Sequence, residues 1–443
     1  MLDRNYDTEE RDLIKEIKNN ELYFDGCSTT DLAKQYGTPL YVMSETGIKE
    51  KIRELKKSFL DKYPNTRIAY ACKAFCTTAM CKICDTEGLC IDVVSGGELY
   101  TAKKAGFPAE RIEFNGNNKL RGEIEDALDY GIGRFIVDSE PDFKQIEEVC
   151  KEKNMTANIL LRITPGVAAS THDFIITGKR DSKFGVPLDE DVFYPLAERA
   201  IKSEHINLLG LHFHIGSQIL DNDAYLKSLD VMLGLVEELK KRFGYDTKEL
   251  NLGGGFGVKY TDEQPKPYSY YIDPMMKKIA SKFAEMQIKM PAVVFEPGRS
   301  IVAEAGLSLY TIGNIKDIRG VRKYIAVDGG MADNIRPALY EAVYDGVVAN
   351  KADEPRNDKA TICGKTCESG DILIRDCAVT DKAEKGDLFA IFSTGAYGFS
   401  MASNYNNCPI PAVVLVREGK SSIIVKRQSY EHMTANHEIP EWL

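Results

Sequence analysis

Two short segments combine reactive side chains with the end of an apolar run. Lys73 closes the run Arg67–Lys73. A lysine at a strand end suits Schiff-base chemistry with an aldehyde, although it can equally extend its ammonium to solvent. Glu296-Pro297-Gly298-Arg299 places a carboxylate and a guanidinium three residues apart. The guanidinium suits bidentate binding of a phosphate or carboxylate, and the carboxylate can keep a heteroaromatic nitrogen protonated. An internal Glu–Arg ion pair is the alternative.

Two further segments suggest a site for a planar, phosphorylated ligand. Gly253-Gly254-Gly255-Phe256-Gly257 exposes backbone N–H groups that a phosphate can approach closely, with a flexible turn as the alternative. The order is not G-x-G-x-x-G, so a dinucleotide is not indicated. His212 and His214 are two apart and face the same side of a strand. With six His in the chain and no acidic cluster nearby, stacking on a cofactor or core packing is favoured over metal ligation.

The cysteines indicate reduced thiols. There are 11, an odd number, with no framework spacing, which is typical of a cytosolic protein. Cys81 and Cys84 form a C-x-x-C near Cys72, Cys76 and Cys90. Structural zinc sites normally need a second such pair or matching histidines. We therefore interpret these thiols as packing groups on and around a helix, and predict no metal.

The elements that must position these residues are short apolar runs alternating with helix-periodic stretches. Residues 223–242 illustrate the latter, with leucines and a valine on one face. The eight runs are Arg67–Lys73, Cys90–Ser95, Arg111–Asn115, Phe135–Ser139, Asn158–Thr164, Leu208–Gly216, Glu249–Gly255 and Ala292–Gly298. Eight strands and the length of 67–298 favour a (β/α)8 TIM barrel over a doubly wound open sheet. The polar and glycine residues above then fall at the carboxyl ends of strands, where barrels build active sites.

The pattern of apolar and polar residues changes after about residue 305. Short alternating segments separated by turn residues predict an all-β domain at the C-terminus. Glu21–Phe24 and Pro39–Met43 read as strands that join it. We therefore expect an N-terminal segment at 1–40 that contributes to the β domain, a barrel at 41–305 and the C-terminal β domain at 306–443.

Composition limits the classes of partner. The chain has 443 residues, 57 Lys plus Arg and 67 Asp plus Glu, hence a net charge of −10. This balance disfavours nucleic-acid and anionic-membrane binding, which need a positive field. No window of about 20 apolar residues occurs and the start is polar, so neither a membrane span nor a secretory signal is expected. We expect a cytoplasmic protein that binds a small molecule.

Taken together, these features fit one cofactor. Pyridoxal 5'-phosphate has an aldehyde for Lys73, a phosphate for the glycine loop, a ring nitrogen for Glu296 and a ring face for a histidine. No single motif indicates it alone, but their joint placement around one barrel mouth does.

The sequence resembles the diaminopimelate decarboxylases, within the alanine-racemase-like, barrel-type pyridoxal-phosphate decarboxylases that include ornithine decarboxylase. The resemblance covers nearly the whole chain. Its motifs are YACKAF, DVVSGGEL, EFNGNNK, DSKFGV, GLHFHIGSQI, NLGGGFG, FEPGR, DNIRPALY, GKTCESGDIL and GAYGFS. One departure is Phe75, where the family usually has Asn.

The resemblance implies a role for each matching residue. Lys73 would bind the cofactor covalently, and His214 would stack on its ring. Its phosphate would be bound by Ser217, Gly254, Gly255 and the turn of Glu296, Pro297, Gly298 and Arg299, with Glu296 facing the pyridine nitrogen. Substrate would be bound by Arg299, Arg336, Tyr340, Glu368 and Tyr397, with Tyr397 also touching the cofactor. Cys367, as proton donor, and Glu368 would be supplied across a homodimer interface, which gives shared active sites.

The implied reaction is decarboxylation of meso-2,6-diaminoheptanedioate to L-lysine and CO2, the last step of lysine biosynthesis. GKTCESGD favours this substrate over ornithine. Two alternatives stay open. One is decarboxylation of another basic amino acid, such as D-lysine, D-ornithine, ornithine, arginine or carboxynorspermidine. The other is a non-catalytic carrier of the cofactor, against which Cys367, Glu368 and Tyr397 argue.

Overall fold

The computed structural model describes residues 14–167 and 182–443. Residues 1–13 of the expected N-terminal segment and Asp181 of the DSKFGV motif lie outside the described residues. The chain divides into two compact units. One is Lys51–Ile301, and the other joins Val302–Leu443 to the chain up to Glu50.

The unit Lys51–Ile301 contains a closed barrel of eight parallel strands, which confirms the predicted fold. The strands are β5 (Thr66–Ala71), β6 (Cys90–Val93), β7 (Ile112–Phe114), β8 (Arg134–Val137), β9 (Ala157–Arg162), β10 (Ile206–His212), β11 (Glu249–Asn251) and β12 (Ala292–Phe295). They pair in chain order, and β12 closes the barrel on β5 through Val293–Thr66 and Phe295–Ile68. All eight predicted runs are strands, each ending before its predicted limit. The polar residues that follow therefore lie in loops rather than in the sheet.

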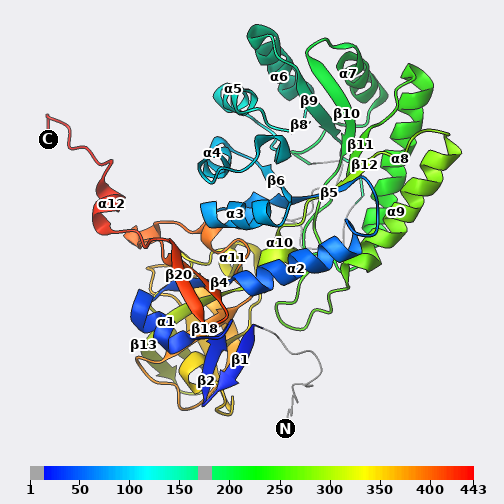
Figure 1. The fold of residues 1–443 in the computed structure, drawn as a ribbon. Helices are drawn as coiled ribbons and strands as arrows, with labels where there is room; N and C mark the ends of the chain where they lie inside the picture. The colour runs from blue at the N-terminus through cyan, green and yellow to red at the C-terminus, as the bar shows by residue number, and fades with distance from the viewer. Residues whose placement is uncertain (1–13, 168–181) are drawn as a thin grey trace. The chain divides into compact units, whose positions relative to one another are not determined.

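Helices surround these strands (Figure 1). They are α3 (Thr78–Thr86), α4 (Gly96–Lys104), α5 (Arg121–Tyr130), α6 (Glu140–Lys153), α7 (Glu190–Lys202), α8 (Asp223–Phe243) and α9 (Tyr268–Glu285). The predicted amphipathic helix is α8, which buries Leu229, Leu233, Val236 and Leu239 and leaves Leu226 partly exposed. It ends where Gly244 adopts a left-handed conformation, φ 65°, which glycine enters without steric cost.

The other unit is built on a nine-stranded mixed sheet. Its strands are β4 (Leu40–Ser44), β13 (Gly306–Ile318), β14 (Arg322–Val327), β15 (Gly346–Val348), β16 (Asp358–Cys363), β17 (Ile372–Val379), β18 (Leu388–Phe392), β19 (Ala412–Arg417) and β20 (Lys420–Val425). A small sheet of β1 (Lys15–Lys18), β2 (Glu21–Phe24) and β3 (Cys27–Ser28) accompanies it. Its short helices are α1 (Thr29–Tyr36), α11 (Arg336–Tyr340) and α12 (Tyr430–Thr434). Two more helices, α2 (Glu45–Ser58) and α10 (Arg299–Val302), each include residues of both units.

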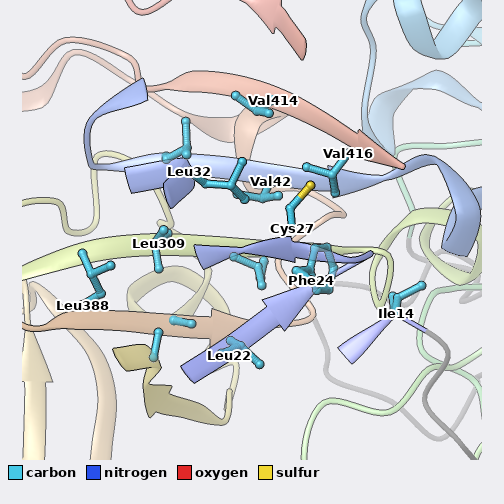
Figure 2. Close-up of a cluster of buried hydrophobic side chains, with 14 of the residues drawn as sticks. Ile14, Leu22, Phe24, Cys27, Leu32, Val42, Leu309, Leu388, Val414 and Val416 are labelled. Carbon is cyan, nitrogen blue, oxygen red and sulfur yellow. The ribbon is translucent and has the colours of Figure 1, made fainter. Parts of the chain in front are cut away.

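Residues from both ends of the chain share one hydrophobic core in this unit. Strand β4 lies between β13 and β19, so residues 40–44 form an internal strand of this sheet. Phe24 and Leu32 pack with Leu309 and Val414, all 3% exposed or less (Figure 2). Burial of this many apolar side chains ties the N-terminal segment to the β unit. None of the described helices combines the length and apolar character that crossing a membrane requires.

Candidate active site

Lys73 lies directly after the first barrel strand. It belongs to a 3-10 turn, Cys72–Ala74, rather than to the strand, and its side chain is exposed while both neighbours are buried. The Ala71 N–H donates to the carbonyl of Pro297 at 3.0 Å. A Cβ at Gly298 would lie 3.0 Å from that of Ala71, so this glycine lets the two segments pack closely. The barrel thus brings the turn of Lys73 beside the turn that follows β12.

Glu296 is the best-anchored polar residue of the site. It is 6% exposed, and its Oε1 accepts hydrogen bonds from the amides of Asn115 (3.2 Å) and Asn251 (2.8 Å). Its Oε2 accepts from His212 Nε2 at 3.0 Å. Burial acts to raise the pKa of Glu296, but the charge and hydrogen bond of His212, with contributions from His214 and Lys73, lower it to about 2. The carboxylate is therefore ionised at neutral pH although it is buried.

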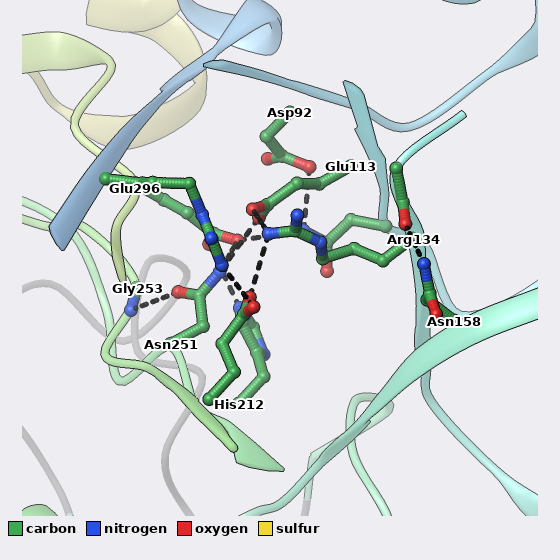
Figure 3. A network of polar contacts seen from close by, with 12 residues as sticks. Asp92, Glu113, Arg134, Asn158, His212, Asn251, Gly253 and Glu296 are labelled. Carbon is green, nitrogen blue, oxygen red and sulfur yellow. Dashed lines mark hydrogen bonds and ion pairs between the residues drawn. The ribbon is translucent and has the colours of Figure 1, made fainter. Parts of the chain in front are cut away.

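A polar network continues from Glu296 through the barrel interior (Figure 3). The amide of Asn251 bridges Glu296 to Glu113, at 2.8 and 2.9 Å. Arg134 Nη1 donates to Glu113 (2.9 Å) and to Glu249 (2.8 Å), and Arg67 also pairs with Glu249. Charged side chains thus replace the branched aliphatic residues that usually fill such barrels. The network holds Asn251, and through it Glu296, in one orientation.

Asp92 on β6 joins the same network. It accepts a hydrogen bond from Asn115 Nδ2 at 2.7 Å, and that amide also donates to Glu296. Burial, and next the negative charge of Glu296, raise the pKa of Asp92 well above its usual range. Glu296 is thus favoured in its ionised form, and Asp92 in its protonated form.

His214 follows β10 and is partly exposed. Its Nδ1 accepts a hydrogen bond from the Gly254 N–H at 3.3 Å. Burial, the positive charge of Lys73 and that of Arg162 lower the pKa of His214 well below its usual value. The imidazole is therefore neutral at neutral pH, unlike a histidine that acts as a cation.

The glycine loop after β11 packs tightly against neighbouring backbone. A Cβ at Gly254 would lie 2.0 Å from the Glu296 carbonyl oxygen, and one at Gly255 would lie 2.4 Å from that of Gly216. Gly255 also has φ 107°, which side chains rarely allow. Packing alone therefore requires these glycines, and it also brings the loop against the turn that contains Glu296.

Arg299 is buried beside this loop. Its Nε donates to Ser217 Oγ at 3.0 Å, and its Nη1 donates to the Tyr260 hydroxyl at 2.5 Å. Arg299 is 6% exposed, and none of the described ion pairs joins it to Glu296; Glu296 instead accepts hydrogen bonds from Asn115, Asn251 and His212. The expected alternative of an internal Glu–Arg ion pair is therefore not what anchors Glu296.

The remaining predicted residues belong to the other unit. Arg336 begins α11, is 6% exposed, donates to the Tyr344 hydroxyl at 2.5 Å and lies 5.9 Å from the centre of the Tyr397 ring. Tyr340, at the end of the same helix, is half-buried. Tyr397 has φ 61°, a left-handed conformation that costs a bulky residue free energy. Such strain persists only where the surroundings enforce it, as at functional sites.

Cys367 and Glu368 are exposed in the loop between β16 and β17. The loop is nevertheless well anchored. Asp371 accepts from the backbone and hydroxyl of Thr366, at 2.9 and 2.5 Å, and the Cys367 N–H donates to Asn406 Oδ1 at 2.6 Å. The structure therefore presents these two side chains on a fixed loop.

Sequence reasoning missed the polar interior of the barrel. The residues concerned are Arg67, Asp92, Glu113, Asn115, Arg134, Arg162, Glu249 and Asn251. The signal was present, because Glu113/Asn115, His212/His214 and Glu249/Asn251 are each two residues apart within or just after a strand, and alternate residues of a strand share a face. Reading the runs as continuously apolar hid this alternation.

Comparisons with known proteins point to one family. Residues 48–303 match the family model described as pyridoxal-dependent decarboxylase, pyridoxal binding domain. Diaminopimelate decarboxylase of Bacillus methanolicus is 47% identical over 412 residues, which are 93% of this chain and 95% of that protein. The enzyme of the same name from Bacillus subtilis is 46% identical over 418 residues, 94% of this chain and 95% of that protein.

Solved structures are similar over the same extent. The structure of diaminopimelate decarboxylase from M. jannaschii in complex with L-lysine has a TM-score of 0.90 at 37% identity. The match covers 97% of this chain and 98% of that one. The Helicobacter pylori enzyme, also with L-lysine, has a TM-score of 0.83 at 32% identity, covering 92% and 98%. The chain therefore belongs to the pyridoxal-dependent decarboxylases, in the diaminopimelate decarboxylase family.

Proposed function

We propose that this chain catalyses the decarboxylation of meso-2,6-diaminoheptanedioate to L-lysine and CO2 with pyridoxal 5'-phosphate. The observation that carries the proposal is Glu296, a buried carboxylate kept ionised at the carboxyl end of a barrel strand. A fixed negative charge there is what a protonated pyridine nitrogen needs as partner. The full-length similarity to diaminopimelate decarboxylases supports the choice of substrate.

The residues present fit the cofactor. Each carboxylate oxygen has two lone pairs, and Glu296 Oε2 accepts one described hydrogen bond, from His212. It therefore has capacity for one more donor, such as a pyridinium N–H. Lys73 would hold the aldehyde carbon through Nζ, and the hydrogen bond from the Ala71 N–H to the Pro297 carbonyl keeps its turn near that of Glu296.

The ring face and the phosphate have matching groups. A neutral His214 can lie against a pyridinium ring without charge repulsion. Ser217, Gly254, Gly255 and the turn from Glu296 to Arg299 would bind the phosphate, with the Arg299 guanidinium oriented by Ser217 and Tyr260. Tyr397 would contact both cofactor and substrate.

The cofactor, when bound, supplies an electron sink for the negative charge that remains when CO2 leaves. Glu296 would accept a charge-assisted hydrogen bond from the protonated ring nitrogen and so keep that proton in place. We propose that Cys367 Sγ then delivers a proton to the carbon that lost CO2, and that Lys73 Nζ can serve the same role. The anchored loop of Cys367 limits the motion of the thiol before this transfer.

Substrate choice rests on opposite charges at the far end of the substrate. Diaminoheptanedioate carries a distal ammonium and a distal carboxylate. Glu368 would bind the former, whereas Arg299, Arg336 and Tyr340 would bind carboxylate. Arg336 is buried, so a substrate without that carboxylate, such as lysine or ornithine, leaves it without its substrate partner.

Release of CO2 from a panel of amino acids tests the proposal. We expect meso-diaminoheptanedioate to be turned over, and D-lysine, D-ornithine, ornithine, arginine and carboxynorspermidine to be turned over at least about 10⁴-fold less efficiently, as for sites that bind a substrate polar group. Preference for one of the latter would establish the alternative decarboxylase. Absence of CO2 release from all of them, with the cofactor bound, would indicate a carrier.

We further propose a homodimer whose active sites are shared. The support is that Cys367 and Glu368 are exposed on an ordered loop of a single chain. Mixing inactive Lys73→Ala and Cys367→Ala proteins tests this, because a mixed dimer would contain one site with both residues intact. We expect partial recovery of activity. No recovery, once subunit exchange has been verified with labelled chains, would contradict a shared site.

Two broader assignments are also proposals. We assign cofactor binding to the segment expected at 41–305, apart from residues 41–44, which belong to β4 of the β sheet, and the family match over 48–303 supports this. We assign completion of the β domain to 1–40 with 306–443. We assign the protein to the cytoplasm, supported by eleven cysteines that are all free thiols. Fractionation of cells with an antibody to the chain would test the latter.

A further inference from the structure

Three thiols lie together next to Lys73. The Sγ atoms of Cys72, Cys76 and Cys81 are all within 4.8 Å of one another. The set differs from the C-x-x-C of the sequence, since Cys84 is not part of it. Cys72 belongs to the 3-10 turn that carries Lys73, Cys76 to the loop that follows, and Cys81 to the first turns of α3.

Local hydrogen bonds fix this arrangement. The Thr77 side chain caps α3 by accepting from the Met80 N–H at 3.0 Å, and the Thr77 carbonyl accepts from the Cys81 N–H at 3.0 Å. Cys72 and Cys81 are 1% and 2% exposed, whereas Cys76 is partly exposed. The three thiols are therefore held together before any ion binds. Two of them are buried, and Cys76 is open to solvent.

We propose that Cys72, Cys76 and Cys81 form a binding site for a soft divalent cation such as Zn²⁺. Thiolates are the preferred protein ligands of such ions. In a tetrahedral site with Zn–S bonds of about 2.3 Å, the sulfurs are about 3.8 Å apart, so the cluster needs a contraction of at most about 1 Å. Three protein ligands leave the fourth position to water, which can enter beside Cys76.

The chemistry of the cluster suits a cation. Cysteine binds metal as the thiolate, so metal binding would displace the thiol protons to solvent, without any change of oxidation state.

The position of the site gives it a consequence. Cys72 and Cys76 flank Lys73 in the chain, and Cys81 lies on α3. An ion bound by all three would link the residues before and after Lys73 to α3. Bound metal should therefore stabilise the holoenzyme against heat, since a ligand that binds only the folded state raises stability.

Zinc binding to the reduced holoenzyme tests the inference. The protein is incubated with Zn²⁺, passed over a desalting column with a weak chelator, and its metal measured by mass spectrometry. We expect one Zn²⁺ per chain. Cys76→Ala and Cys81→Ala should each weaken binding by more than the roughly 10–100-fold that loss of an outer-shell partner causes. Cys84→Ala, on the same helix and also buried, is the matched control and should retain the ion.

Two readouts keep the test independent of activity and of folding. Co²⁺ in place of Zn²⁺ should show thiolate-to-metal charge-transfer absorption that Cys76→Ala diminishes and Cys84→Ala does not. In the unmodified protein, Zn²⁺ should protect Cys76 from alkylation. The inference is overturned if the reduced holoenzyme retains no Zn²⁺, if folded Cys76→Ala and Cys81→Ala bind it like wild type, or if Cys84→Ala alone loses it.

Discussion

Replacing Glu296 by glutamine removes a charge from the barrel while keeping its shape. Three donors point at the carboxylate, from Asn115, Asn251 and His212. The glutamine oxygen can still accept from the two amides. Its NH2 group then faces His212 Nε2, which can accept if the imidazole proton moves to Nδ1, an atom that has no hydrogen-bond partner. We therefore expect Glu296→Gln to fold.

The cost to stability and the cost to activity differ in size. Hydrogen bonds to a charged group contribute about 1 kcal/mol more than neutral ones, so three bonds put the loss of unfolding free energy at up to about 3 kcal/mol, offset by easier burial of a neutral group. Loss of the charge opposite the ring nitrogen removes one preorganised interaction of the transition state. Removing one such interaction typically lowers kcat by about 10²–10³.

The pH dependence of stability provides a second signature. Because the pKa of Glu296 is lowered to about 2, its ionised form stabilises the folded protein above its usual pKa of 4.5. That stabilisation is lost as pH falls from about 4.5 to about 2. A glutamine has no such transition, so the acid side of the stability profile should flatten in the variant.

The assay is kcat on meso-diaminoheptanedioate at saturating cofactor, with thermal unfolding of the holoenzyme. The matched control is Glu249→Gln, which changes another buried carboxylate of the same network. Glu249 begins β11, whereas Asn251, the hydrogen-bond partner of Glu296, ends it, and Glu249 pairs with Arg134 and Arg67. We expect the control to lose stability and to keep kcat within a few fold. If Glu296→Gln keeps the kcat of wild type with a normal content of cofactor, the role assigned to its charge is wrong.

Three further outcomes follow from the structure. Lys73→Ala should lose both turnover and the borohydride-reducible attachment of cofactor, and full activity of this variant would contradict the site. Lys119 is buried and pairs with Asp142 at 2.8 Å, so Lys119→Met should cost about 3–5 kcal/mol of stability with little effect on kcat; an unchanged melting midpoint would contradict this. Burial raises the pKa of Asp333 from 3.8 to about 7, so its contribution to stability declines as pH rises from 3.8 to about 7, and Asp333→Asn should remove that decline in the thermal midpoint.

The fold could be predicted because its signals are local. Each barrel strand is a short run with turn residues after it, and α8 repeats its leucines at helical spacing. Strand ends were less predictable. Lys73 was expected in a strand but lies in a 3-10 turn. The strand ends at Ala71, its last pair with β6, whereas the apolar run in the sequence continues beyond it and hides this end.

The site was predictable only in part, for a physical reason. Lys73, His214 and Glu296 have reactive groups next to turn residues, which a sequence displays directly. The residues that orient these groups are not displayed in this way. Asn115 and Asn251 act through hydrogen bonds to Glu296, which lies far away in the chain. Their spacing indicates only a shared face, and the partner across the barrel depends on closure of the sheet.

The barrel interior separates anchoring from chemistry along one network. At one end, Arg134 and Arg67 neutralise Glu249, and these charges have no place in the proposed reaction. At the other end, the hydrogen bonds to Glu296 from the described residues come from two amides and His212, and none of the described ion pairs joins its carboxylate to an arginine. A carboxylate already paired with a guanidinium would offer little to a pyridinium. The amide bridge through Asn251 thus transmits orientation from the ion pairs to Glu296 without transmitting positive charge, and this leaves the carboxylate able to act on the cofactor.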